Sequence, residues 1–130
     1  DKKNQILTQM DSLGQNWETL CNAIKPYPAC HFNHAFADCA LAIKKEHALE
    51  ANSIQRVTAL IHEDQVPIVC EPIGQKRKPR NSYEAQFSIP YIISAIFVYG
   101  KFTLTELKTN ALNNSEVGKL AEKIYYETNI

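Results

Sequence analysis

The sequence has no excess of charge of either sign, no Cys-x-x-Cys pair and no apolar run long enough to cross a membrane. Its 14 basic and 14 acidic residues cancel, so no overall field favours binding to nucleic acid or to an anionic membrane surface. The longest apolar run, residues 89–99, is far shorter than the ~20 residues that a membrane helix needs. No charged leader followed by an apolar stretch opens the sequence, and we therefore expect a protein of the cytoplasm or of an organelle matrix.

The 130 residues suffice for one domain with a core of its own, and they contain no internal repeat. Four cysteines stand at positions 21, 30, 39 and 70, and their spacing fits no redox motif. In a reducing compartment cysteine is commonly a small buried residue. We therefore predict four buried free thiols.

Helix-like and strand-like patterns alternate along the chain. The apolar spacing, Gly and Pro positions and capping residues predict helices over residues 1–13, 28–47 and 88–100, short helices opening at Thr103 and Asn113, and strands over residues 17–24, 57–61 and 124–130. Residues 65–81, with three prolines, are predicted to be irregular. The alternation favours the α/β (α+β) class, as a two-layer sandwich in which helices cover a small sheet. An apolar stripe that includes Phe32, Phe36 and Ile43 is expected to pack onto one face of that sheet.

The segment KPYPACHFNHAFAD, residues 25–38, holds the densest set of chemically useful side chains. Lys25 ends the predicted strand over residues 17–24, and the two prolines after it prevent the strand from continuing. His31, His34 and Asp38 then follow at helical spacing. A cation facing imidazoles in the first turns of a helix suits binding and proton transfer on a substrate that carries carboxylates.

Within this segment we predict Lys25 and His34 as catalytic residues. Asp38 stands one helical turn after His34, where its carboxylate could fix the tautomer of the imidazole. His31, Asp38 and Tyr27 are predicted to bind substrate or to support the catalytic pair. The structural alternatives are an exposed lysine at a strand end, a solvated His34–Asp38 pair and a tyrosine that only packs.

Two other groups of residues invite a binding hypothesis. Cys30, His31, His34 and Asp38 are chemically suitable metal ligands, but four ligands on successive turns of one helix cannot all point at one ion. We therefore expect no metal, and no cofactor. The basic run QKRKPR at 75–80 could bind phosphate or nucleic acid, although a solvated loop beside the cleft is the prediction that we favour.

Several separated motifs, taken together, resemble one family. They are LGQNWETL at 13–20, KPYPACHFNHAFADCALAI at 25–43, VPIVCEP at 66–72 and YEAQFSIPY at 83–91. In this order they are similar to the MmgE/PrpD family, which includes 2-methylcitrate dehydratase, cis-aconitate decarboxylase and an iminodisuccinate epimerase. The resemblance runs from about Leu13 to Ile124.

The resemblance implies a large helical domain and a smaller α/β lid domain, with the active site in the cleft between them. Residues 1–130 resemble the lid domain and stop before the last strands that the resemblance implies. We therefore interpret the chain as a piece of a protein several times longer, whose helical domain is its first partner. A homodimer of the complete protein is a further possible assembly.

The resemblance also places the family's active-site lysine at Lys25 and implies a small di- or tricarboxylate substrate. We favour elimination of water, as in 2-methylcitrate dehydratase of propionate metabolism, over decarboxylation or epimerisation. Decarboxylase members carry the motif's histidine one residue nearer the lysine than His31, and a tyrosine where this chain has Ile68. The alternative is a binding or dimerisation domain without chemistry of its own.

Overall fold

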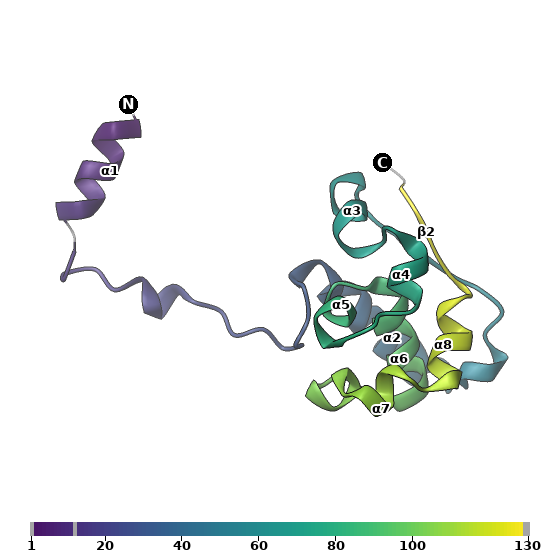
Figure 1. Cartoon of the computed structure of the whole chain (residues 1–130). Coiled ribbons are helices and arrows are strands. Elements are labelled where there is room, and N and C mark those ends of the chain that lie inside the picture. Colours follow the sequence, from purple (N-terminus) through teal and green to yellow (C-terminus); the bar gives the residue numbers. More distant parts are fainter. Residues whose placement is uncertain (1, 12, 129–130) are drawn as a thin grey trace.

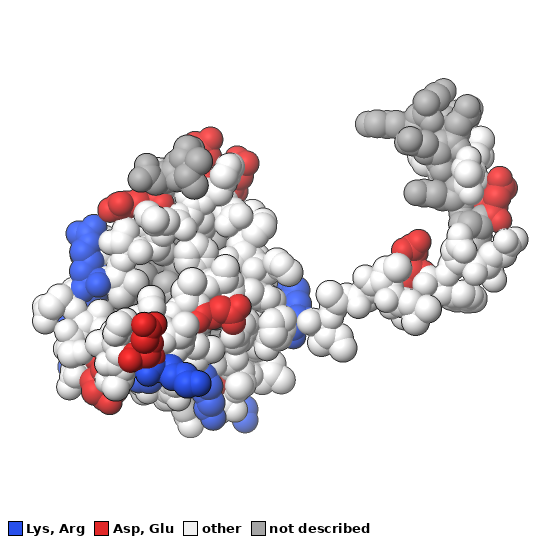
Figure 2. Space-filling view, turned by 180° about the vertical axis from the view of Figure 1, so that it is seen from behind, with Lys and Arg blue, Asp and Glu red and all other residues white. Residues whose placement is uncertain are grey.

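An N-terminal arm and a separate body make up the structure, which is a computed structural model that describes residues 2–11 and 13–128 (Figure 1). The arm, residues 2–24 without residue 12, contains α1 (Lys2–Asp11) and the single turn η1 (Glu18–Cys21). It extends away from the body in Figure 1 and, seen from behind, in Figure 2. The predicted N-terminal helix is confirmed within the described residues, and Gly14 follows it with a φ of 81°.

The strand predicted over residues 17–24 is wrong. Its central residues form η1, and Ile24 at its end is 96% exposed. Trp17, Leu20 and Ile24 are spaced three and four residues apart, which matches one face of a helix better than the alternation of a strand. No other segment lies beside them to supply a strand's hydrogen bonds in the described part of the chain.

The body is built from helices around a small sheet, which confirms the α/β class. Its elements are η2 (His31–Asn33), α2 (His34–His47), η3 (Ala51–Ser53), β1 (Val57–Leu60), η4 (Glu63–Gln65), α3 (Val66–Val69), α4 (Ile73–Arg77), α5 (Ser82–Gln86), α6 (Ile89–Tyr99), η5 (Leu104–Leu107), α7 (Thr109–Leu112), α8 (Ser115–Ala121) and β2 (Ile124–Glu127). The strands β1 and β2 pair in parallel, with Val57 opposite Ile124 and Leu60 opposite Glu127. A parallel pair requires a crossover connection, and all the helices from α3 to α8 lie within it.

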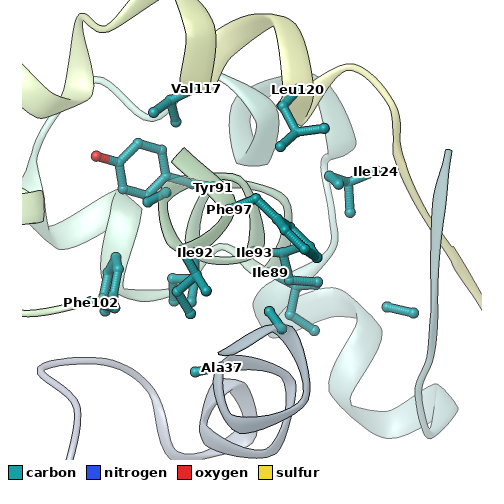
Figure 3. Packing of buried hydrophobic residues seen from close by; sticks show 14 of the residues in the cluster. Ala37, Ile89, Tyr91, Ile92, Ile93, Phe97, Phe102, Val117, Leu120 and Ile124 are labelled. Carbon is teal, nitrogen blue, oxygen red and sulfur yellow. The ribbon is translucent and has the colours of Figure 1, made fainter. Parts of the chain in front are cut away.

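Helix α6 is the centre of the core. Nine of its eleven residues are buried. Figure 3 shows their side chains pointing toward α2 on one side and toward α8 and Ile124 on the other. Ser88 caps the helix by accepting a hydrogen bond from the Tyr91 amide at 3.0 Å, and Gly100 ends it with a φ of 70°, as the sequence predicted. In the described ranges, no helix is long and apolar enough to cross a membrane.

The buried face of α2 differs from the predicted stripe. His34, Ala37 and Ala40 are buried, whereas Phe32 is 38% and Ile43 44% exposed. Helix α2 packs on α6 instead of lying over the sheet. Ile89, Ile92 and Ile93 of α6 fill the space toward α2. The small alanine side chains of α2 therefore face α6, Phe36 is only partly buried against the core, and Ile43 turns outward.

Two further predictions need correction. Residues 65–81 are not irregular throughout, because they contain α3 and α4, with Pro67 in the first turn of α3 and Pro72 as the N-cap of α4. The cap of α8 is Asn114, one residue after the predicted Asn113. The capping box of Thr103 with Glu106 is confirmed, although the element that it opens is the 3₁₀ turn η5.

Ser88→Ala is expected to destabilise the body by about 1–3 kcal/mol. The Ser88 hydroxyl is fully buried, donates to the Lys76 carbonyl at 2.5 Å and caps α6, so alanine removes both bonds. Urea unfolding followed by circular dichroism measures the change. Ser82→Ala, at the exposed start of α5, is the matched control and should lie within about 0.5 kcal/mol of the original chain.

The four cysteines are free, but only Cys70 is buried. Cys21 on the arm and Cys39 in α2 are exposed, so the prediction of burial is wrong for both. Burial, with a smaller contribution from the Glu71 carboxylate, raises the pKa of the Cys70 thiol to about 11.

At pH 8 we expect Ellman's reagent to modify Cys21 and Cys39 rapidly and Cys70 only after unfolding. Only about a thousandth of the Cys70 thiol is ionised at that pH, and the buried sulfur is inaccessible. Mass spectrometry of peptides from the native and the urea-unfolded chain identifies the modified residues. Equal modification rates for Cys70 and Cys39 in the native chain would contradict the packing of the core.

Candidate functional site

The turn between the arm and α2 brings the side chains of Lys25 and His34, the two predicted catalytic residues, to the same carbonyl oxygen. The Nζ of Lys25 donates to the carbonyl oxygen of Ala29 at 3.2 Å, and Nε2 of His34 lies 3.3 Å from the same oxygen. A carbonyl only accepts, so the second hydrogen bond requires a proton on Nε2. The ammonium and the imidazole are therefore neighbours around a shared acceptor, although the strand predicted to present Lys25 does not form.

Aromatic rings hold His34 in place. Its side chain is buried, and the ring of His31 stacks on it with centroids 4.9 Å apart and planes at 29°. The ring of Tyr27 meets the His34 ring edge-on at 5.5 Å. His31 itself is exposed, so the outer imidazole is open to solvent while the inner one is not. The 3₁₀ turn η2 ahead of α2 places both rings on the same side.

Asp38 contacts Tyr27 instead of His34. Its Oδ1 accepts a hydrogen bond from the Tyr27 hydroxyl at 2.5 Å. The prediction that Asp38 fixes the His34 tautomer is therefore wrong, because His34 turns inward to Ala29 while Asp38 stays on the exposed side of α2. The hydrogen bond with Asp38 is the main cause that raises the pKa of Tyr27 to about 12, so this hydroxyl stays protonated and donates at neutral pH.

An open cavity of about 560 Å³ lies beside Lys25. Its wall comes from residues 24–29, from Gln86 and from residues 102–104. Gln86 also connects the end of α5 with the residues before α2. Its backbone oxygen accepts hydrogen bonds from the Cys30 amide at 2.8 Å and from Asn33 Nδ2 at 3.0 Å. Asn33 is fully buried, so this contact fixes the start of α2 against the end of α5.

The sequence reasoning missed Gln86, Asn33 and Thr103 as parts of this region. Gln86 and Thr103 lie far along the chain from Lys25, and no local motif connects them to it. Asn33 stands inside the predicted motif, and its position between two histidines was the available signal. Within the described residues, no group of three or more His, Cys, Asp or Glu side chains could hold a metal ion.

Most of the chain matches a known protein family. The MmgE/PrpD C-terminal domain family matches residues 27–129. No curated protein matches the chain. The matched range contains Tyr27, His31, His34 and Asp38, and Lys25 stands two residues before its start. The match covers the whole described body from Tyr27 onward, and the chain therefore belongs to the MmgE/PrpD C-terminal domain family.

Proposed function

We propose that this domain closes the substrate cleft of a lyase or isomerase that acts on a small di- or tricarboxylate. Elimination of water, as in a 2-methylcitrate dehydratase, is the reaction that we favour. The observation that carries the proposal is the meeting of Lys25 Nζ and His34 Nε2 at the Ala29 carbonyl, beside an open cavity. The family membership supports the same class of site.

The proposed chemistry needs one cation and one group that moves a proton. Removing a proton from the carbon next to a carboxylate pushes negative charge onto that carboxylate, and the ammonium of Lys25 would stabilise it. In neutral His34 the proton sits on Nε2, so Nδ1 is the nitrogen free to accept one. The hydroxyl group of the substrate leaves as water once it has gained a proton. The exposed ring of His31, which stacks on the His34 ring, would contact the substrate or position it. The Tyr27–Asp38 pair would do the same.

The cleft needs a second wall, which we assign to a helical domain elsewhere in the complete protein. The Lys25 cavity is open, and the exposed Lys25 contributes to its lining. We place the protein in the cytoplasm or an organelle matrix, with no cofactor. Two copies of the complete protein could form a dimer.

The isolated 130-residue chain is expected to be inactive, because it supplies one wall only. The complete protein should convert 2-methylcitrate. The assay follows the loss of substrate, and cis-aconitate and citrate are tested separately as alternative substrates. Turnover by the isolated chain at the rate of the complete protein would contradict the two-wall site. No turnover of any of the three acids by the complete protein would contradict the proposed substrate class.

A binding or dimerisation domain without chemistry is the second candidate. The exposed apolar residues Phe32 in η2 and Ile43 on α2 favour it, because such side chains commonly mark a contact surface. The two candidates differ in Lys25, since a contact domain has no need of an ammonium beside the cavity. Unchanged turnover and unchanged assembly of the complete protein in the variant Lys25→Ala would support this second candidate.

A further inference from the structure

A second and larger cavity, of about 1000 Å³, lies on another part of the body. One wall is the segment from Gly74 to Arg80, which includes most of the basic run at 75–80. The other wall runs from the end of α7 through α8, and the buried Tyr91 of α6 contributes to its lining. The two cavities share no lining residue, so this second groove is not part of the site at Lys25. We call it the basic groove.

Four cations and one carboxylate line the basic groove. They are Arg77, Lys78, Arg80, Lys119 and Glu122. Two of the cations already have partners, because Arg77 pairs with Glu122 at 3.4 Å and Arg80 pairs with Glu84 at 2.5 Å. Across the described residues, the side-chain ammonium groups of Lys78 and Lys119 make no hydrogen bond or ion pair. The groove thus has one uncompensated ammonium on each wall.

Arg77 adds a fixed cation to the same groove. Its Nη2 donates to the Ile124 carbonyl at 2.9 Å, and its guanidinium lies 5.0 Å from the centre of the Tyr125 ring. The contacts with Glu122, Ile124 and Tyr125 hold the side chain, which is only 17% exposed. Its Nε is nevertheless buried without a hydrogen-bond partner. The guanidinium therefore lines the groove as a cation held in place by these contacts, while its buried Nε lies out of reach of a ligand.

We propose that the basic groove binds a small molecule that carries a phosphate group. A phosphate offers several acceptor oxygens and up to two negative charges, which matches two free ammonium groups on facing walls together with the fixed guanidinium of Arg77. The cavity is large enough for more than the phosphate itself. The chain as a whole is neutral, which disfavours the broad electrostatic attraction that nucleic acid needs. This proposal uses no residue of the proposed active site.

Inorganic pyrophosphate is the probe, added to the ¹⁵N-labelled chain while amide chemical shifts are recorded. We expect saturable shifts confined to residues that line the groove, such as Gly74, Gly118 and Lys119. The double variant Lys78→Gln/Lys119→Gln should bind about tenfold more weakly, because both free ammonium groups are lost. Both lysines are exposed and unpaired, so the variant should keep the circular dichroism spectrum of the original chain.

Lys45→Gln/Lys108→Gln is the matched control. It removes the same charge from two exposed lysines outside the groove and should bind pyrophosphate as the original chain does. Three results would overturn the proposal. They are the absence of saturable shifts, equal weakening in both double variants, and tighter binding of a short oligonucleotide than of pyrophosphate.

Discussion

In the complete protein, Lys25→Ala is expected to lower turnover about 10²–10³-fold and to leave the melting temperature unchanged. Lys25 is exposed, and its single hydrogen bond goes to the Ala29 carbonyl, so its removal costs the fold little. The loss in rate follows if the ammonium stabilises charge that develops on a substrate carboxylate. Steady-state kinetics with 2-methylcitrate measure it. Lys45→Ala, an exposed lysine on α2, is the control that should keep full turnover.

Lys25→Arg separates two roles of the ammonium. Arginine keeps the charge but does not release a proton at working pH. Near-normal turnover in this variant would make Lys25 an electrostatic anchor, and a loss as large as that of the alanine variant would indicate proton transfer or a strict geometry. Unchanged turnover in Lys25→Ala would remove Lys25 from the catalytic site.

His34 and His31 should differ in the same assay. His34→Ala removes the imidazole that contacts the Ala29 carbonyl oxygen together with Lys25, and it should lower the rate strongly. His31→Ala leaves that pair in place and should lower the rate less. Because His34 is buried, its variant also requires a melting curve, so that loss of rate is read only from folded protein. A greater loss from His31→Ala would transfer the proton-moving role to the exposed imidazole.

Local signals predicted the parts of the fold that are decided locally. Helix α6 has a capping serine, a proline in the first turn, a continuous apolar run and a glycine at its end. Each of these four features affects the helix at its own position in the sequence. The strand β1 alternates as a half-buried strand does, and β2 was predicted as the tail strand. Its pairing with β1 in parallel depends on the path of the chain between them, which no local pattern contains.

Which face of α2 is buried could not be predicted from the helix alone. Apolar spacing indicates Phe32 and Ile43, but the residues of α2 that are buried next to the bulky side chains of α6 include the small Ala37 and Ala40. The buried face of a helix is thus decided by the neighbour against which it packs.

The candidate site was predictable where its members are close in sequence. Lys25, Tyr27, His31 and His34 lie within ten residues, and the structure brings them together through one turn and two ring contacts. Helical spacing correctly put Asp38 near this group, but it could not show that His34 would turn inward and leave the carboxylate to Tyr27. Gln86 and Thr103 could not be predicted because tertiary packing alone places them there, whereas Asn33 stands inside the motif between two histidines.

Ile96→Ala is expected to cost about 2–5 kcal/mol of the free energy of unfolding, the largest effect on stability that we predict. Ile96 is fully buried in the middle of α6, so alanine leaves a cavity that the surrounding helices cannot fill without moving. A domain of this kind is stable by only about 5–15 kcal/mol, so this one change removes a large share. Urea unfolding followed by circular dichroism measures it, with the slope of the transition used to check that unfolding stays two-state.

Ile43→Ala is the matched control, because it makes the same chemical change inside another helix. The gain in helix propensity is then common to both variants, and only burial differs. Ile43 is 44% exposed on the outer face of α2, so its loss should change the free energy of unfolding by no more than about 0.5 kcal/mol. The predicted apolar stripe would have placed Ile43 in the core and made its loss costly. Equal destabilisation by the two variants would therefore support the predicted stripe and contradict the packing of α2 on α6 through its alanines.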